Sequence, residues 1–427
     1  MRSTSSDGSA ARWGGGVGAG VVAFAAVTLV VLPQNYVALD PFWKAIAQVA
    51  TLVGGIVAIL MLMKKDKRSA VTLLLVAAFF AMVASFQGVE VWTTAYMLAP
   101  FAIGLAASPR GLNDRRFLVL LWAALLVLSL SVAVDAVAGA ARVASLFGDV
   151  YRVTGMTESR PRGLMGQPVP TAIAVAIVTV AVVRLSSRIR SIGVRRVSIT
   201  AAIAAGAFAV IYTGTRSALI VLALGLLVNM LLPIRGGQRA NRLISFMAFA
   251  LMIAVVLWLW PRVGGSFSQL RAFSFDSLEG TDSAQNRQYA LTIFDSWLSD
   301  CNFDCKLVGS GPRDLQHQLL NYIGFNGLTT VDNLYVTLLW DFGVVGLLVF
   351  ISPGIIALRR LLDRRPSVAL ASLVVVLVYI SGFFFDTLYT IPFVVILGFF
   401  FGSFSRARDG ESDGARVSTP SVLSLKE

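Results

Sequence analysis

The sequence predicts an all-α polytopic membrane protein with about twelve transmembrane helices and one large extracytoplasmic loop. Two observations support this fold class. Hydrophobic residues make up 56% of the 427 residues and charged residues only 14%, a composition too apolar for one water-soluble core. Apolar runs of about 17 to 25 residues recur along the chain and match the ~30 Å hydrocarbon core of a bilayer. Such runs must be helical, because a helix satisfies its own backbone hydrogen-bonding groups.

Taken in order, the apolar runs predict helices at residues 16–33, 45–63, 69–87, 91–108, 117–138, 168–185, 198–213, 216–233, 243–260, 334–357, 366–384 and 390–404. We therefore expect residues 1–404 to form one membrane domain. The polar leader lacks a convincing cleavage site, so we expect the first helix to be retained. Residues 405–427 are polar and contain no aromatic residue, which predicts a disordered cytoplasmic tail.

The net charge of +13 predicts an orientation rather than nucleic-acid binding. Basic residues cluster in alternate short gaps between the expected helices. If these gaps and both termini are cytoplasmic, 25 of the 36 Lys and Arg residues lie inside and 15 of the 23 acidic residues lie outside. This distribution follows the positive-inside rule, and the basic excess also suits anionic lipid.

Two expected extracytoplasmic segments are long enough to hold a site, residues 139–167 and residues 261–332, the latter between the ninth and tenth helices. In the second, residues 283–301 have helical apolar spacing and predict an amphipathic helix on the membrane surface. Cys301 and Cys305 lie in the same loop, where an oxidising compartment favours a disulfide over two reduced thiols. With one histidine in the chain, we do not expect a zinc site.

Arginines on the expected outer side are the first candidate site residues. Arg160, Arg162, Arg216 and Arg287 would form a cluster of guanidinium groups, whose planar geometry suits a phosphate or diphosphate. Two alternatives remain open. Arg216 could be an interfacial arginine that extends to the headgroups, and Arg287 could lie on the solvated face of a surface helix.

The start of the tenth expected helix provides the candidate acids. Asp332 could accept a proton or could simply be an N-cap, for which Asp is a preferred residue. Asp341 lies deeper, where pairing with an arginine is favoured over a role as a base. His317 is the sole imidazole, and an exposed loop histidine is more often ordinary than catalytic. We interpret Asp135 and Asp386 as structural residues.

Four local patterns occur in order over residues 155–357. They are "RPRGL" followed by "GLMGQPVPTA", then "TGTRSALIVLALGLL", then "NRQYALTIF" with "LVGSGPRDL", and finally "DNLYVTLLWDFG". This arrangement resembles the O-antigen ligase and Wzy-type O-antigen polymerase superfamily. The last pattern departs from the family, because Asp332 stands where ligases typically have histidine. The departure favours a polymerase over a ligase that transfers to a lipid, wall or protein acceptor.

The resemblance implies a metal-independent glycosyltransferase of the bacterial inner membrane that acts on its outer leaflet. The donor would be an undecaprenyl-diphosphate-linked glycan, and polysaccharide chain-length or flippase components are possible partners. The residues carried over are the diphosphate ligands Arg160, Arg162, Arg216 and Arg287, the catalytic Asp332 or His317, and the supporting Arg313, Asn333 and Asp341.

A twelve-helix transporter is the competing class. The second inter-helix gap, "KKDKRS", lacks the motif of the major facilitator family, and the two halves of the sequence do not match. Broken helices near the membrane midplane would favour this reading.

Overall fold

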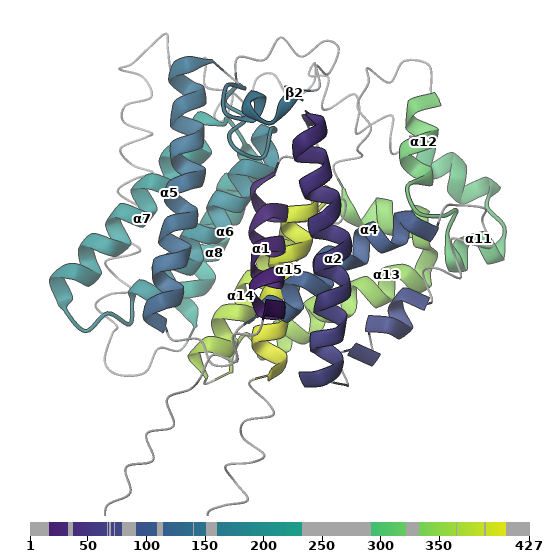
Figure 1. Ribbon diagram of the computed structural model, residues 1–427. Helices are drawn as coiled ribbons and strands as arrows, with labels where there is room; N and C mark the ends of the chain where they lie inside the picture. The colour runs from purple at the N-terminus through teal and green to yellow at the C-terminus, as the bar shows by residue number, and fades with distance from the viewer. Residues whose placement is uncertain are drawn as a thin grey trace, which may run out of the picture.

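The computed structural model describes residues 17–32, 37–65, 67, 70–71, 73–78, 91–108, 114–139, 141–150, 160–232, 292–321, 333–363, 365–387 and 390–406. In this part of the chain the fold is helical, with one small antiparallel sheet (Figure 1). Its labelled elements are α1 (Val17–Val31), β1 (Val37–Leu39), α2 (Pro41–Lys65), α4 (Val91–Ala107), α5 (Asp114–Ala138), η1 (Ala144–Leu146), β2 (Gly148–Val150), α6 (Pro168–Ser186), α7 (Ile192–Tyr212), α8 (Arg216–Leu231), α11 (Phe303–Val308), α12 (Asp314–Asn321), α13 (Leu334–Arg360), α14 (Pro366–Ser381) and α15 (Ile391–Arg406).

Long apolar helices indicate that the protein is embedded in a membrane. Among the described residues, five helices are long and apolar enough to cross a bilayer: Pro41–Lys64, Phe117–Ala138, Pro168–Ser186, Ile192–Tyr212 and Leu334–Arg360. Shorter apolar helices lie within α1, α4, α8, α14 and α15. Of the expected helix at 69–87, residues 70–71 and 73–78 are helical. Its other residues, and the expected helix at 243–260, lie outside the described residues.

One predicted boundary is wrong by six residues. The expected helix at 198–213 begins in the structure at Ile192, as α7. The hydropathy pattern placed the start after Arg195 and Arg196, but the helical hydrogen bonds already include the bond from the Arg195 amide to the Ser191 carbonyl, 3.0 Å. Charged side chains at a helix end can extend away from the membrane interior, so they do not end the helix.

Two hydrophobic cores share α15. The larger core joins α5, α6, α7, α8 and α14 and includes Phe393 and Phe400 of α15. The smaller core joins α1, α2 and α4 and includes Val395 of α15. Helix α6 lies at the centre of the larger core and is buried along almost its whole length. An apolar residue on every side of α6 fits this position, because no face of it meets solvent.

Glycines allow α4 and α15 to cross with their backbones in contact. A Cβ atom on Gly104 would collide with the carbonyl oxygen of Val395, and one on Gly398 would collide with that of Phe101. Small residues commonly allow such close approach between membrane helices. This crossing connects the smaller core to the rest of the bundle.

The small sheet fixes which helix ends share one end of the molecule. Strands β1 and β2 pair antiparallel with Val37 opposite Val150 and Leu39 opposite Gly148. Because β1 precedes α2 and β2 follows α5, the start of α2 and the end of α5 lie together, at the top of Figure 1. The segment that follows the end of α5 carries Arg160 and Arg162.

The turn between α13 and α14 is held by an ion pair. The Arg365 Nη2 atom lies 3.0 Å from the Asp363 carboxylate, which also accepts a 2.8 Å hydrogen bond from the Arg365 backbone amide. The side-chain hydrogen bond from Arg365 lowers the pKa of Asp363. The pair therefore keeps its charge at neutral pH and closes the turn before Pro366 begins α14.

Candidate functional site

A buried carboxylate on α5 holds the loop that carries Arg160 and Arg162. Asp135, in the last turn of α5, is 1% exposed. Its Oδ2 atom accepts hydrogen bonds from the backbone amides of Gly163 (2.8 Å) and Arg162 (3.1 Å), and its Oδ1 atom accepts one from Val143 (2.8 Å). Three amide donors compensate the burial of one negative charge. Asp135 thus joins Val143 to the backbone of Arg162 and Gly163.

Neighbouring side chains fix the same loop at further points. Ser131, one turn before Asp135, accepts a 3.0 Å hydrogen bond from the Leu164 amide. Thr171 on α6 donates a 2.6 Å hydrogen bond to the Arg162 carbonyl. Gly163 adopts a φ of +62°, which an L-residue rarely adopts, and a Cβ there would press on Thr171. The backbone of Arg162 is therefore held on both sides by α5 and α6.

Arg160 connects this loop to the turn between α7 and α8. Its Nε atom donates a 2.8 Å hydrogen bond to the Thr213 carbonyl, and its Nη2 atom donates a 3.3 Å hydrogen bond to Thr215 Oγ1. Thr215 directly precedes Arg216, the first residue of α8. Arg160 and Arg216, expected to lie close together, are indeed brought to one turn by these hydrogen bonds. The guanidinium of Arg160 is half-buried, as is the side chain of Arg216.

The charge around this turn is uniformly positive along the sequence. Residues 159–275 contain no Asp or Glu, although Arg160, Arg162 and Arg216 all fall within them. The guanidinium of Arg160, held by Thr213 and Thr215, and the amino end of α8 favour an anion. We call Arg160, Arg162, Thr215 and Arg216 the arginine centre.

Replacing Asp135 by asparagine is expected to destabilise the protein. An amide offers one acceptor oxygen, and its NH₂ group would face a backbone amide that now donates to the carboxylate, so about 2 to 3 kcal/mol of unfolding free energy should be lost. Thermal unfolding in detergent would measure this loss. Ser131→Ala is the matched control, because it removes a single neutral acceptor and should cost about 1 kcal/mol. Equal unfolding temperatures for Asp135→Asn and the wild type would show that Asp135 does not hold the loop.

A second polar centre lies where α13 is interrupted. At Gly343 the backbone leaves the helical conformation, with φ +63° and ψ −167°. A Cβ on Gly343 would lie 2.6 Å from the Gly309 amide nitrogen and would collide with the Leu307 backbone. Gly309 has a similar conformation (φ +83°, ψ −176°), and a Cβ there would collide with Asp341 and Phe342. The loop after α11 is therefore pressed against the break in α13.

Asp341, immediately before this break, accepts hydrogen bonds from the loop. It is fully buried, and its carboxylate accepts hydrogen bonds from the backbone amides of Arg313 (2.9 Å) and Leu315 (3.2 Å). The backbone carbonyls of Trp340 and Asp341 accept hydrogen bonds from Ser310 and Gly311. Asp341 was expected to pair with an arginine. Its carboxylate accepts a hydrogen bond from the backbone amide of Arg313, and together with the bond from Leu315 this positions the start of α12. We call Asp341, Gly343, Gly309 and Arg313 the break centre.

Stacked aromatic rings cover the break centre on one side. Trp297 stacks on Trp340 with ring centroids 5.0 Å apart and donates a 2.7 Å hydrogen bond to Ser310 Oγ. Phe294 stacks on Trp297, and α12 adds Leu315 and Leu319 to the same cluster. Residues 292–300 are helical, as predicted, but the apolar face formed by Ile293, Phe294 and Trp297 contacts protein. This face stays partly exposed beside α12 and α13, and the position of the helix on the membrane surface stays a prediction.

The cap of α13 is Asn333. Its Oδ1 atom accepts hydrogen bonds from the backbone amides of Tyr335 (3.0 Å) and Val336 (3.3 Å). The alternative interpretation of Asp332 as the N-cap is therefore wrong, because the side chain of the next residue, Asn333, caps the helix.

The remaining candidate residues are not brought together by the described part of the chain. Asp332 and Arg287 themselves lie outside the described residues. His317 is exposed on α12, and Arg313 is exposed with a φ of +65°.

Cys301 and Cys305 are joined by a disulfide. Between them, the Asn302 side chain caps α11 by accepting a 2.9 Å hydrogen bond from the Cys305 amide. The bridge closes the turn that leads into α11 and thereby fixes the start of the helix that ends beside Gly309.

Within the described ranges, no group of three or more His, Cys, Asp or Glu side chains could hold a metal ion.

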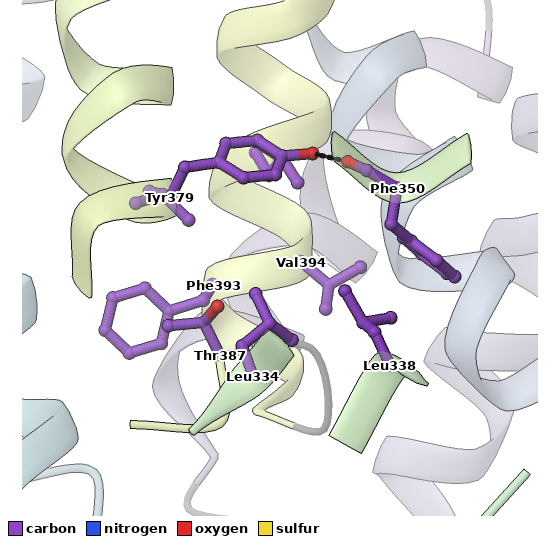
Figure 2. A pocket seen from close by; sticks show the side chains of 9 residues that line it. Leu334, Leu338, Phe350, Tyr379, Thr387, Phe393 and Val394 are labelled. Atoms are coloured by element: carbon purple, nitrogen blue, oxygen red, sulfur yellow. Dashed lines mark hydrogen bonds between the residues drawn. The ribbon is translucent and has the colours of Figure 1, made fainter. Parts of the chain in front are cut away.

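An apolar pocket opens beside the start of α13 (Figure 2). Its lining comes from α13, α14, α15 and the segment before α15: Leu334, Leu338, Phe350, Val378, Tyr379, Thr387, Phe393, Val394 and Leu397. The Tyr379 hydroxyl donates a hydrogen bond to the Phe350 carbonyl across the pocket, as Figure 2 shows. The cavity volume is about 20 Å³, room for about one water molecule, so the pocket is a small gap in the packing of these helices.

The arginine centre and the break centre lie on different sides of the bundle. The helix ends that form the arginine centre belong to α5, α6, α7 and α8 in the left half of Figure 1, and α11 and α12 lie at its right edge. The expected single constellation therefore appears as two centres in the described part of the chain. No protein-family model matches the chain, and no curated protein matches it.

Proposed function

We propose that the protein transfers a glycan from an undecaprenyl diphosphate carrier to a sugar hydroxyl on the outer leaflet of the bacterial inner membrane, and so polymerises the repeat units of a surface polysaccharide. In this proposal the chain crosses the membrane twelve times, both termini are cytoplasmic, and residues 261–332 form an extracytoplasmic loop. Five long apolar helices support the membrane location. The arginine centre supports the proposed transfer chemistry.

The observation that carries the proposal is the fixed position of Arg160. Its guanidinium is oriented by Thr213 and Thr215, and its loop is held by Asp135. In glycosyl transfer the bond between the sugar C1 and the diphosphate oxygen breaks, and the electron pair leaves with the diphosphate. Guanidinium groups already in place stabilise this developing negative charge without reorganisation. Arg162, Arg216 and, in the undescribed segment, Arg287 would add further positive charge.

The acceptor side needs a group that takes the hydroxyl proton while the acceptor oxygen bonds to C1. We assign this role to Asp332, with His317 as the second choice. Asp332 directly precedes Asn333, the N-cap of α13, in the sequence. His317 is exposed on α12 and could reach a substrate that lies outside the bundle.

A transporter remains the second candidate, because α13 is interrupted at Gly343. In transporters, the backbone groups freed by such breaks face a substrate cavity. Here the carbonyls of Trp340 and Asp341 accept hydrogen bonds from Ser310 and Gly311 of the chain itself. The break is thus a docking point for the α11–α12 segment, which favours the enzyme.

The two candidates are separated by the lipid-linked glycans of a deletion strain. We expect single repeat units on undecaprenyl diphosphate to accumulate, and we expect the wild-type gene, but not Arg162→Ala, to relieve the accumulation; mass spectrometry of the extracted glycans measures both. Accumulation of long lipid-linked chains would identify a ligase instead. An unchanged lipid-linked pool with altered uptake or export of a solute would identify a transporter.

A further inference from the structure

Helix α11 exposes an apolar face that no described residue covers. Phe303 is 76% exposed and Leu307 is 39% exposed. The two side chains are four residues apart and therefore share one face of the helix. This face differs from the aromatic face of residues 292–300, which contacts Leu315, Leu319 and Trp340.

The exposed face of α11 continues into the exposed face of α13. Leu307 lies against the break at Gly343, where a Cβ would collide with the Leu307 backbone. The next residue, Val344, is 43% exposed, and Leu348, one turn further along α13, is 61% exposed. Because α13 is long and apolar enough to cross a membrane, Val344 and Leu348 are placed to contact lipid. Exposed apolar side chains therefore occur on both helices that meet at this contact, Phe303 and Leu307 on α11 and Val344 and Leu348 on α13.

The position of α11 agrees with lipid contact. Figure 1 shows α11 at the side of the helix bundle, next to α13, and not above the upper end of α2. The residues around Phe303 are polar, since Asn302 and Asp304 flank it and both are exposed. An aromatic side chain between polar neighbours suits the boundary between headgroups and acyl chains.

We infer that Phe303 and Leu307 insert into the interfacial layer of the lipid bilayer and anchor the α11–α12 segment to the membrane beside α13. The disulfide between Cys301 and Cys305 and the Asn302 cap hold α11 rigidly at its first turn. The contact between Gly309 and Gly343 fixes its other end. Insertion of α11 therefore sets the height of the break centre relative to the membrane surface.

Photocrosslinking tests this inference on the complete, unmodified chain. The purified protein is reconstituted into phosphatidylethanolamine and phosphatidylglycerol vesicles that contain a phospholipid with a diazirine close to the glycerol, and the labelled peptides are identified by mass spectrometry. We expect an adduct yield on the peptide with Phe303 and Leu307 about tenfold above that on the α12 peptide with exposed His317. The peptide with Val344 and Leu348 serves as the positive control.

Phe303→Ser gives the matched variant, because a side chain that is 76% exposed contributes little to folding. The variant should lose most of the label on α11 and keep the label on α13. Label on α13 without label on α11 in the wild type would overturn the inference. Equal label on the α11 peptide of the wild type and of Phe303→Ser would overturn it as well, because the label would then not depend on the Phe303 side chain.

Discussion

Replacing Arg160 by alanine is expected to reduce glycan transfer by about two to three orders of magnitude, the loss typical of removing one fixed donor to a developing oxyanion. The substitution removes the guanidinium that Thr213 and Thr215 orient at the start of α8. Transfer would be measured in membranes by sizing the lipid-linked glycans. Folding should survive, because the backbone of the loop remains held by Asp135 and Thr171.

Arg142→Ala is the matched control for Arg160→Ala. Arg142 follows α5 at the same end of the molecule, and its side chain is exposed. Its removal subtracts the same charge without altering the α7–α8 turn, so transfer should remain close to the wild-type level. Arg160→Lys should be intermediate, since an ammonium keeps the charge but cannot reproduce the planar pair of hydrogen bonds. Equal losses for Arg142→Ala and Arg160→Ala would mean that only the total charge matters.

Replacing Gly343 by alanine is expected to cost more than about 4 kcal/mol of unfolding free energy, which is exceptional for one methyl group. Two causes act together. The φ and ψ of Gly343 lie in a region that is essentially restricted to glycine. The added Cβ would also lie 2.6 Å from the Gly309 amide nitrogen, where only backbone atoms could move away. The melting temperature and the yield of monodisperse protein in detergent would measure the effect.

Gly193→Ala provides the control for Gly343→Ala. Gly193 lies in α7, and a Cβ there would meet nothing within 4 Å. Alanine should be neutral or stabilising by up to about 1 kcal/mol at a helical position. If Gly343→Ala unfolds at the same temperature as Gly193→Ala, the docking of the α11 loop onto the break in α13 is wrong.

The helices were largely predictable from the sequence, because their signal is local. A run of apolar residues that matches the bilayer thickness defines a helix without reference to its neighbours. The expected spans at 117–138, 168–185 and 334–357 correspond to α5, α6 and α13 within a few residues. The start of α7 was misplaced, because hydropathy marks where charge begins and not where helical hydrogen bonds begin.

The arrangement of the sites was predictable only in part. Arg160 and Arg216 were expected near each other, but no local pattern indicated that Thr213 accepts a hydrogen bond from Arg160 or which amides Asp135 binds. Asp135 is separated from Gly163 by 28 positions, and Arg160 from Thr213 by 53. Asp135 was interpreted as structural, which its three amide hydrogen bonds support. An acid near the end of an apolar helix was the single available clue, because burying it requires donors from elsewhere in the chain.

The break in α13 could not be predicted, since its cause lies in another segment. Gly343 and Gly309 are ordinary glycines in sequence, and only their contact requires both to lack a side chain. The N-cap of α13 is Asn333, and the cap was only one of two interpretations left open for the preceding Asp332, because Asp and Asn are both good N-caps. The contacts of helix 292–300 with α12 and α13 could not be predicted either, because amphipathic spacing does not distinguish a lipid surface from a protein surface.

The most direct test of the proposed function is a reaction with purified components. The wild-type chain and the Arg160→Ala variant are reconstituted into vesicles with the lipid-linked glycan extracted from the deletion strain, and both glycan length and free undecaprenyl diphosphate are followed by mass spectrometry. We predict that the wild type produces a ladder of longer glycans and releases one undecaprenyl diphosphate for each linkage, and that Arg160→Ala, although folded, does neither. A folded wild type that lengthens no glycan and releases no carrier would contradict the assignment of the arginine centre to glycosyl transfer.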